Sequence, residues 1–297
     1  MRVVTTFPAA TEIVCALGVD PVGVSHACDY PSRVESIPSV TSTTIDLGHS
    51  SEAIDETVSD LGATAAISID GEQIARLDPD VVVTQGMCEV CAVDGDRVRG
   101  AVSAADSPAD PHYCSLTPHS MADLFAGIEQ VATALDRPSA GEQLVSSLQG
   151  RIDQVRGRTA SAGPRVAILD WLDPVMVAGH WTAELVTWAG GRYGLAGTGD
   201  HSRPREWAEI RTYDPDVLVL APCGFDIDRT LEELAVVRER PGFEGLTAAD
   251  AGRVWVMDGS QYLNRPGPRL VDTLEVLAAI FDSADSPPDE AAVRVGQ

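Results

Sequence analysis

Apolar residues along the chain follow two patterns that alternate in a regular order. Short runs rich in β-branched residues predict strands at 3–6, 22–25, 80–84, 165–170, 217–221 and 254–257. Apolar positions three and four residues apart predict a helix that ends at 17 and further helices at 52–61, 183–189, 229–238 and 268–281. Strands and helices that alternate in this way predict parallel sheets covered by helices on both faces.

The pattern changes between residues 120 and 162. Apolar residues there recur at helical spacing from Leu124 to Val155, which predicts one long amphipathic helix, or two collinear helices with a break at 136–139. On either side, the heptad Leu-Asp-Pro-Asp-Val-Val-Val at 77–83 is echoed by Tyr-Asp-Pro-Asp-Val-Leu-Val at 213–219. We therefore expect an α/β fold of two Rossmann-like parallel-sheet lobes bridged by a long α-helix. The expected divisions are an N-terminal lobe 1–119, a bridging helix 120–162, a C-terminal lobe 163–283 and a flexible tail 284–297.

The charge of the chain excludes several partners. It contains 45 acidic residues and 21 basic ones, all arginine, for a net charge of −24. Such a protein repels nucleic acid and anionic lipid, and no apolar run is long enough for membrane insertion. Because salt screens self-repulsion, an acidic chain of this kind suggests a halophilic source. The first six residues predict a strand and not an export signal. We therefore expect a cytoplasmic protein, or an extracytoplasmic one if a leader is missing from the sequence.

The loops after the predicted strands contain most of the candidate ligand-binding residues. Ligands of parallel α/β sheets bind outside the carboxyl ends of the strands. Backbone amides at the start of a helix can bind an anion. An imidazole can bind a metal ion or an amide, and an arginine can bind a phosphate or an amide. The flat ring of Trp181 suits stacking on a planar macrocycle, or packing against the next helix. The predicted ligand-binding residues are Phe7, Pro8, Thr11, His26, Cys28, Tyr30, Cys88, Cys91, His180, Trp181, Cys223, Phe225 and Arg265.

The other polar candidates are weaker. We expect surface or capping roles for His49, His112, His119 and His201. Motifs typical of serine hydrolases, nucleotide-binding enzymes and zinc proteases are missing from the sequence, so we predict no enzymatic activity.

Cys88 and Cys91 form a Cys-x-x-Cys motif that has three interpretations: a redox pair, ligands of a soft metal ion, or packing residues. Cys28 and Cys223 lie in other candidate loops and could converge with them. Thiolates suit zinc, copper(I) or the cobalt of a corrinoid.

Five pieces of the chain together resemble a known family: residues 7–13, 25–31, 71–80, 179–191 and 264–270. In order and spacing they are similar to the substrate-binding proteins of ABC transporters, of the cobalamin and iron-siderophore type. The resemblance implies a class III periplasmic-binding-protein-like fold that binds cobalamin or a related corrinoid between its lobes without covalent chemistry. It also implies an ABC permease as partner. In such proteins each lobe docks onto the permease through one glutamate. The first-lobe counterpart here is Glu72. In the second lobe the equivalent position is Ala208, and the candidate is Glu209 beside it.

Two alternatives remain open beside the corrinoid. One is an iron-siderophore or haem binding protein. The other is a cytoplasmic thiol-metal carrier or redox protein that uses Cys88 and Cys91. In each case the ligand is a metal chelate or a metal ion.

Overall fold

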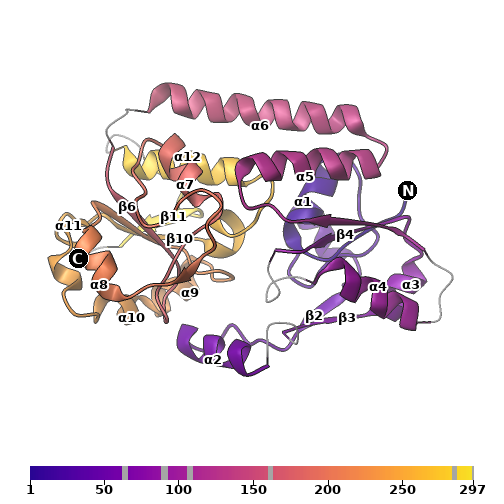
Figure 1. Cartoon of the computed structure of the whole chain (residues 1–297), viewed down its shortest axis with the longest axis horizontal. Coiled ribbons are helices and arrows are strands. Elements are labelled where there is room, and N and C mark those ends of the chain that lie inside the picture. The colour runs from indigo at the N-terminus through magenta and orange to yellow at the C-terminus, as the bar shows by residue number, and fades with distance from the viewer. Residues whose placement is uncertain (62–65, 88–92, 106–109, 160–162, 283–285, 296–297) are drawn as a thin grey trace.

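The chain folds into two α/β lobes that lie side by side along its longest axis (Figure 1). This computed structural model describes residues 1–61, 66–87, 93–105, 110–159, 163–282 and 286–295. The predicted α/β architecture with parallel-sheet lobes and a bridging helix is confirmed. None of the helices in the described residues is long and apolar enough to span a membrane.

The first lobe is built on a three-stranded parallel sheet in the order β1-β4-β5. The predicted strand at 22–25 is reduced to isolated bridges, Val4 with Gly23 and Val24 with Ser39. A separate antiparallel pair, β2 and β3, lies below the sheet in Figure 1. The elements of this lobe are β1 (Val3–Thr5), α1 (Pro8–Ala16), β2 (Thr41–Thr43), α2 (Ser51–Leu61), β3 (Ile67–Ile69), α3 (Gly71–Leu77), β4 (Val81–Gln85), α4 (Gly95–Ala104), β5 (His112–Leu116) and α5 (Met121–Ala134).

The second lobe contains a six-stranded sheet in the order β11-β10-β9-β6-β7-β8. Its centre is parallel, as predicted, whereas β7, β8 and β11 at the edges pair antiparallel. Its elements are β6 (Val166–Trp171), β7 (Met176–Val177), α7 (Thr182–Trp188), β8 (Arg203–Pro204), α8 (Trp207–Tyr213), β9 (Val217–Leu220), α9 (Ile227–Glu232), α10 (Leu234–Arg238), α11 (Thr247–Asp250), β10 (Val254–Met257), a π-helical turn (Gly259–Leu263), α12 (Leu270–Phe281) and β11 (Ala292–Arg294).

The end of the chain differs from the predicted flexible tail. Residues 292–294 form β11, which pairs antiparallel with β10. Ala291 and Ala292 are buried, and Val293 packs against the core of the second lobe. The edge of β10 thereby gains a partner, which outweighs the polar composition of this segment.

The repeated heptad forms the same local structure in both lobes. Asp78 ends α3 and Asp214 ends α8, each with left-handed backbone at φ 43° and φ 47°. Two residues later, Asp80 and Asp216 each accept the backbone N–H of the arginine that precedes β1 or β6, at 2.6 and 2.7 Å. The aspartates thus set the start of the central strands in each lobe.

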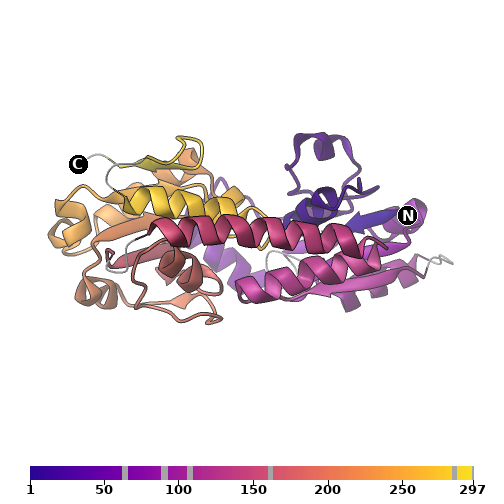
Figure 2. The same cartoon turned by 90° about the horizontal axis from the view of Figure 1, so that it is seen from above.

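The segment predicted as one helix or two collinear helices is a helical hairpin. Helix α6 (Pro138–Arg158) folds back along α5, and only α6 continues across both lobes (Figures 1 and 2). Asp136, with φ 56°, reverses the chain, and Pro138 opens α6. The prediction of collinear helices is wrong, because the chain folds back and the apolar faces of α5 and α6 pack against each other. The 21 residues of α6 span about 30 Å.

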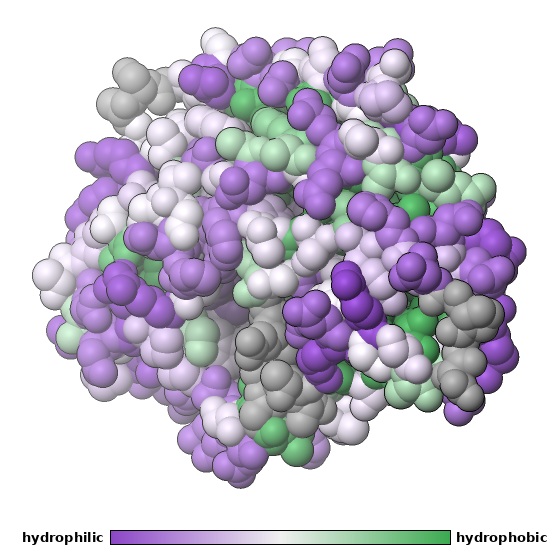
Figure 3. Space-filling model, turned by 45° about the vertical axis from the view of Figure 1, so that its right-hand side comes forward, coloured by the Kyte–Doolittle hydropathy of each residue, from purple (hydrophilic) through white to green (hydrophobic). Residues whose placement is uncertain are grey.

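One hydrophobic core runs through both lobes beneath α6. It includes Ile13 of the first lobe, Leu148 and Ile152 of α6, and Ile168 and Leu274 of the second lobe. The large hydrophobic side chains left exposed among the described residues are few: Met1, Tyr30, Leu47, Leu61 and Leu231. Accordingly, hydrophilic residues predominate on the face shown in Figure 3.

The close approach of α5 and α6 gives a test of the hairpin. A Cβ atom added to Gly141 would lie 2.5 Å from the Cβ of Ala132, whereas one added to Gly150 meets nothing within 4 Å. We expect Gly141→Ala to destabilise the protein by about 1–3 kcal/mol, because the two helices must separate. Gly150→Ala, the matched control on the same helix, should stabilise it by up to about 1 kcal/mol through helix propensity. Chemical unfolding measures both values, and a stabilising Gly141→Ala would contradict the observed packing.

Candidate ligand site at the seam between the lobes

Loops of the two lobes meet along a boundary that we call the seam. From the first lobe come the start of α1, the loop 25–31, the loop after β5 and the segment before α2. From the second come the loops after β9 and β10 and the loops around α7. Contacts across it include Asp29 with Arg265, His119 with His180, and Leu47 near Gly224. The seam therefore collects the carboxyl-end loops where α/β proteins bind ligands.

A buried ion-pair network closes one edge of the seam. Both terminal nitrogens of Arg265 bond Asp29, at 2.5 and 2.8 Å, and one lies 3.3 Å from Glu12. Arg269 donates to the same Glu12 oxygen at 2.7 Å. Partial burial alone would raise the pKa of Asp29, but the hydrogen bonds and charge of Arg265 lower it. The prediction that Arg265 is free for a ligand phosphate or amide is wrong, because acidic residues of the first lobe occupy its guanidinium.

A second set of contacts holds the segment before α2 against the second lobe. The Glu233 carboxylate accepts the hydroxyl of Ser51 at 2.7 Å and its backbone N–H at 3.1 Å. Arg229 donates to the backbone oxygen of Leu47 at 2.9 Å and also to that of His49. Figure 1 shows α2 reaching away from the rest of the first lobe toward α9. These contacts fasten the seam on the side opposite α6.

His26 lies exposed on a first-lobe loop with a defined hydrogen-bond pattern. Its Nδ1 lies 2.8 Å from the Thr41 hydroxyl oxygen, and that hydroxyl donates to Ser25 at 3.0 Å. The His26 Nδ1 must therefore carry the proton, which leaves Nε2 with a free lone pair. Partial burial lowers the pKa of His26, which favours the neutral ring. A neutral imidazole with one nitrogen fixed by a hydrogen bond is the form that ligates metals.

Tyr30, four residues after His26, is also exposed. It is 48% exposed, and the guanidinium carbon of Arg269 lies 4.3 Å from its ring centroid. The ring thus belongs to the first lobe but rests on a second-lobe arginine. A half-exposed flat ring at the seam suits stacking on a planar ligand.

Four of the predicted ligand-binding residues are core residues instead. Phe7 and Thr11 are 2% and 0% exposed, and Trp181 and Phe225 are 4% and 0% exposed. The indole N–H of Trp181 donates to the backbone oxygen of Leu263 at 2.9 Å, so its ring is not available for stacking. These aromatic residues pack the seam from within because their large apolar surfaces gain most from burial. Pro8, at the start of α1, is partly exposed.

The predicted thiol ligands fall into three groups. Burial raises the pKa of Cys28 to about 11, and its sulfur lies 3.0 Å from the Thr11 hydroxyl. The Cys28 thiol is therefore buried and protonated at pH 7, and its role as a ligand contact stays a prediction. Cys223 is half-buried, and its N–H donates to the Asp170 backbone oxygen at 2.9 Å. Cys88 and Cys91 lie outside the described residues.

Three histidines meet at the other edge of the seam. His180 and His201 of the second lobe face His119 of the first, and their ligand-capable nitrogens lie within 4.8 Å of one another. Burial, with the charges of the other two histidines, lowers the pKa of His180 to about 4. His201 is exposed, as expected of a surface residue, but it also belongs to this cluster, and His119 is partly buried in it. No pattern in the sequence could reveal this, because the cluster forms only when the two lobes come together.

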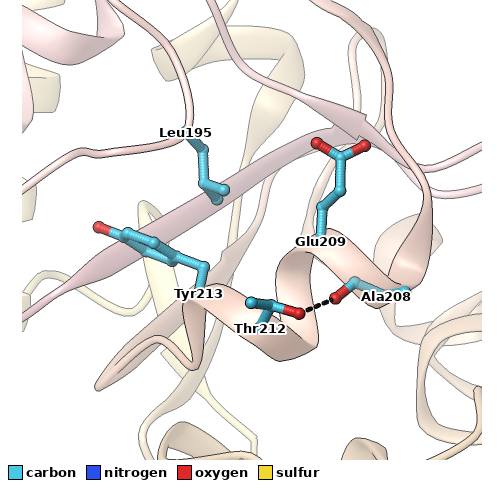
Figure 4. A pocket seen from close by; sticks show the side chains of 5 residues that line it. All are labelled: Leu195, Ala208, Glu209, Thr212 and Tyr213. Carbon is cyan, nitrogen blue, oxygen red and sulfur yellow. Dashed lines mark hydrogen bonds between the residues drawn. The ribbon is translucent and has the colours of Figure 1, made fainter.

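The two predicted docking glutamates differ in their surroundings. Glu72, in the first turn of α3, is 78% exposed and lies 3.4 Å from Arg76. Glu209, in the first turn of α8, bonds Arg205 at 3.0 Å and the backbone N–H of Glu206 at 3.2 Å. Figure 4 shows Glu209 beside a pocket of about 430 Å³ lined also by Leu195, Ala208, Thr212 and Tyr213. Docking through these residues stays a prediction.

Asp170, at the carboxyl end of β6, is a buried acid that the sequence did not single out. It accepts the Ser202 hydroxyl through Oδ2, while its Oδ1 has no partner among the described residues. Burial raises the pKa of Asp170 to about 6. The negative charge of this side chain therefore opposes folding at neutral pH.

Replacement of Asp170 by asparagine should reveal this effect through pH. Because its folded pKa lies above the unfolded one, the aspartate destabilises the protein progressively as pH rises from about 4 to 6. We expect Asp170→Asn to stabilise the protein by up to about 3 kcal/mol at pH 8, and hardly at pH 4. Urea unfolding at the two pH values, at constant salt, measures the difference. Asp153→Asn on the exposed face of α6 should show no such pH dependence, and a pH-independent effect of Asp170→Asn would refute the assignment.

Removal of the shared acid in the ion-pair network should loosen the seam. We expect Glu12→Gln to lower the free energy of unfolding by about 3 kcal/mol, since two buried guanidinium groups lose their common partner. Glu72→Gln, which removes an exposed ion pair, is the control and should cost less than about 1 kcal/mol. Denaturant unfolding of the unaltered protein and of the two variants measures these losses. Equal, small losses in both variants would mean that the network contributes nothing.

The chain and its fold are similar to those of known binding proteins. A family model for periplasmic binding proteins matches residues 3–260. No curated protein sequence matches the chain. The fold is similar to an ABC transporter substrate-binding protein from Listeria monocytogenes EGD-e, with 19% identity, a TM-score of 0.69, and coverage of 94% of this chain and 98% of that one.

Two further structures are similar over their whole length. The periplasmic vitamin B12 binding protein of Vibrio cholerae has 19% identity and a TM-score of 0.65, with 94% of this chain and 96% of that chain covered. A periplasmic haem-binding protein from Roseiflexus sp. RS-1 has 22% identity and a TM-score of 0.69, with 94% and 97% covered. At these identities the likeness shows the fold.

These findings correct the expected location. The matching model describes periplasmic proteins, and the proteins from Vibrio cholerae and Roseiflexus are both periplasmic. The expectation of a cytoplasmic protein is therefore wrong, because it rested on the first six residues alone. Binding proteins of this kind are also not enzymes, in agreement with the sequence. With its family model matched over residues 3–260, the chain belongs to the periplasmic binding protein family.

Proposed function

We propose that the protein binds a metal-centred macrocycle at the seam, with cobalamin or a related corrinoid as the first candidate. The observation that carries this proposal is His26, whose Nε2 has a free lone pair on an exposed first-lobe loop. An axial position of cobalt accepts such a nitrogen. Support comes also from the similar fold of the vitamin B12 binding protein from Vibrio cholerae.

Tyr30 supplies the second part of the proposed site. Its half-exposed ring lies across the seam from the second lobe and can lie flat on a corrin. Together His26 and Tyr30 provide one metal ligand and one stacking surface, the two contacts that a large flat chelate needs. Pro8, His180 and Cys223 stay proposed neighbours of the ligand.

Haem is the second candidate. The fold is as similar to the haem-binding protein from Roseiflexus as to the cobalamin binder, and haem iron also accepts an imidazole nitrogen. An iron siderophore remains a third ligand of the same class. Cys88 and Cys91 as ligands of a soft metal ion, or as a redox pair, stay a prediction, and replacement of both by serine separates that interpretation from chelate binding.

We further propose that the loaded protein delivers its ligand to an ABC permease. The predicted docking residues are Glu72 and Glu209, one on each lobe, and both are partly exposed. Acidic side chains suit arginines on a permease surface. Glu72 is the better exposed of the two, so its replacement should weaken docking more.

Titration with candidate chelates tests the proposed function. We expect aquacobalamin to bind one-to-one with a shifted corrin spectrum, because the His26 nitrogen replaces the labile water. Cyanocobalamin, whose axial cyanide exchanges slowly, should bind without that shift. Absorbance and calorimetry in high salt measure both, with haemin and a ferric hydroxamate as parallel ligands. Binding of haemin alone would transfer the proposal to haem, and no binding of any chelate would overturn it.

Variants identify the axial ligand. His26→Ala should abolish the shift and weaken aquacobalamin binding by about tenfold, equivalent to about 1.4 kcal/mol. His112→Ala, another exposed histidine but on β5, is the matched control and should bind like the unaltered protein. An unchanged spectrum shift in His26→Ala would refute the role of His26 while leaving corrinoid binding itself intact.

A further inference from the structure

Half of the six histidines in the chain meet at one place, although they are far apart in the sequence. His119 lies between β5 and α5 in the first lobe. His180 precedes α7, and His201 precedes β8, both in the second lobe. The three rings are 5.0 to 5.2 Å apart by their centroids. The cluster includes His180, a proposed neighbour of the chelate, but neither His26 nor Tyr30, which supply the proposed metal ligand and stacking surface.

The distances within the cluster fit ligands of one small metal ion. The Nδ1 atoms of His119 and His180 lie 3.2 Å apart. Two nitrogens that bind one tetrahedral zinc at 2.0–2.1 Å are separated by roughly 3.3 Å. A nitrogen of His201 completes a group in which all three ligand atoms lie within 4.8 Å of one another. Only small side-chain shifts are needed to close the set on an ion.

The backbone holds two of the imidazoles in place. His180 has left-handed backbone with φ 55°, an uncommon conformation for a residue other than glycine. Its N–H donates to the Asp200 backbone oxygen at 2.5 Å, and its own oxygen accepts from Gly199 at 3.0 Å. These bonds fix the loop of His180 beside the loop of His201. On the first lobe, the His119 N–H donates to Asp123 at 3.0 Å.

We propose that His119, His180 and His201 form a binding site for a divalent transition-metal ion, with Zn²⁺ the best match. Imidazole ligands favour zinc, copper and nickel over magnesium and calcium, which prefer oxygen. Three protein nitrogens leave a fourth position for water or an external ligand. Because His119 belongs to one lobe and the other two histidines to the second, the bound ion joins the lobes across the seam. The site does not depend on the proposed chelate.

Metal titration of the chelator-treated, reduced full-length protein tests the proposal. We expect one Zn²⁺ per chain to bind in high salt, where weak binding to surface carboxylates is suppressed, and Mg²⁺ not to compete. Co²⁺ serves as a spectroscopic probe, since four-coordinate cobalt absorbs strongly in the visible range. A spectrum without a thiolate charge-transfer band identifies nitrogen ligands and excludes the cysteines.

Each histidine of the cluster is then replaced: His119→Ala, His201→Ala and His180→Asn, because asparagine tolerates left-handed backbone. Outer-shell substitutions at metal sites cost 10–100-fold in affinity, so loss of a direct ligand should weaken Zn²⁺ binding by about 100-fold or more. The double variant His49→Ala/His112→Ala, which removes exposed histidines elsewhere, should keep full affinity. Thermal unfolding without metal verifies that each variant is folded.

Two results would overturn the proposal. One is the absence of stoichiometric Zn²⁺ binding by the unaltered protein. The other is equal affinity in the cluster variants and in the His49→Ala/His112→Ala control, or a cobalt spectrum dominated by thiolate. Since no chelate is present in these titrations, their failure would leave cobalamin or haem binding untouched, and failure of chelate binding would leave the metal site untouched.

Discussion

The continuous hydrophobic core beneath α6 determines how the two lobes can behave. Each lobe has a hydrophobic cluster of its own, but residues of both lobes and of α6 also pack into one shared cluster, which resists movement of one lobe against the other. A helix of 21 residues also resists bending where it crosses the seam. The loops at the seam are therefore held at nearly fixed separation, and recognition depends on their side chains more than on closure of a hinge.

A fixed seam forces its buried polar groups to find partners inside the protein. Glu12 takes two arginines from the other lobe, and Glu233 takes Ser51. This requirement explains why Arg265, which the sequence suggests for ligand binding, instead forms ion pairs that join the two lobes. The proposed ligand contacts are instead His26 and Tyr30, which are both exposed.

The architecture could be predicted from the sequence because local patterns carry it. The two Asp-Pro-Asp corners predict matching strand starts. Asp80 and Asp216 accordingly each accept the backbone N–H of the arginine that precedes the first strand of their lobe. A break at 136–139 could be predicted, but not the reversal of the chain at Asp136, because apolar spacing is the same for collinear helices and for a hairpin. The cluster of His119 with His180 was missed for another reason: 61 residues separate them, and only the packing of the lobes joins them.

The absence of lysine makes every cation at the seam a guanidinium, and this has a structural consequence. A planar guanidinium bonds several acceptors at once, as Arg265 does with Asp29 and Glu12, and Arg229 with Leu47 and Glu233. Salt screens exposed ion pairs much more than buried ones. Salt screening reduces the self-repulsion of a chain with a net charge of −24, while buried arginine contacts between the lobes are screened less. Added salt should therefore weaken the repulsion between surface carboxylates more than it weakens the arginine contacts that join the lobes.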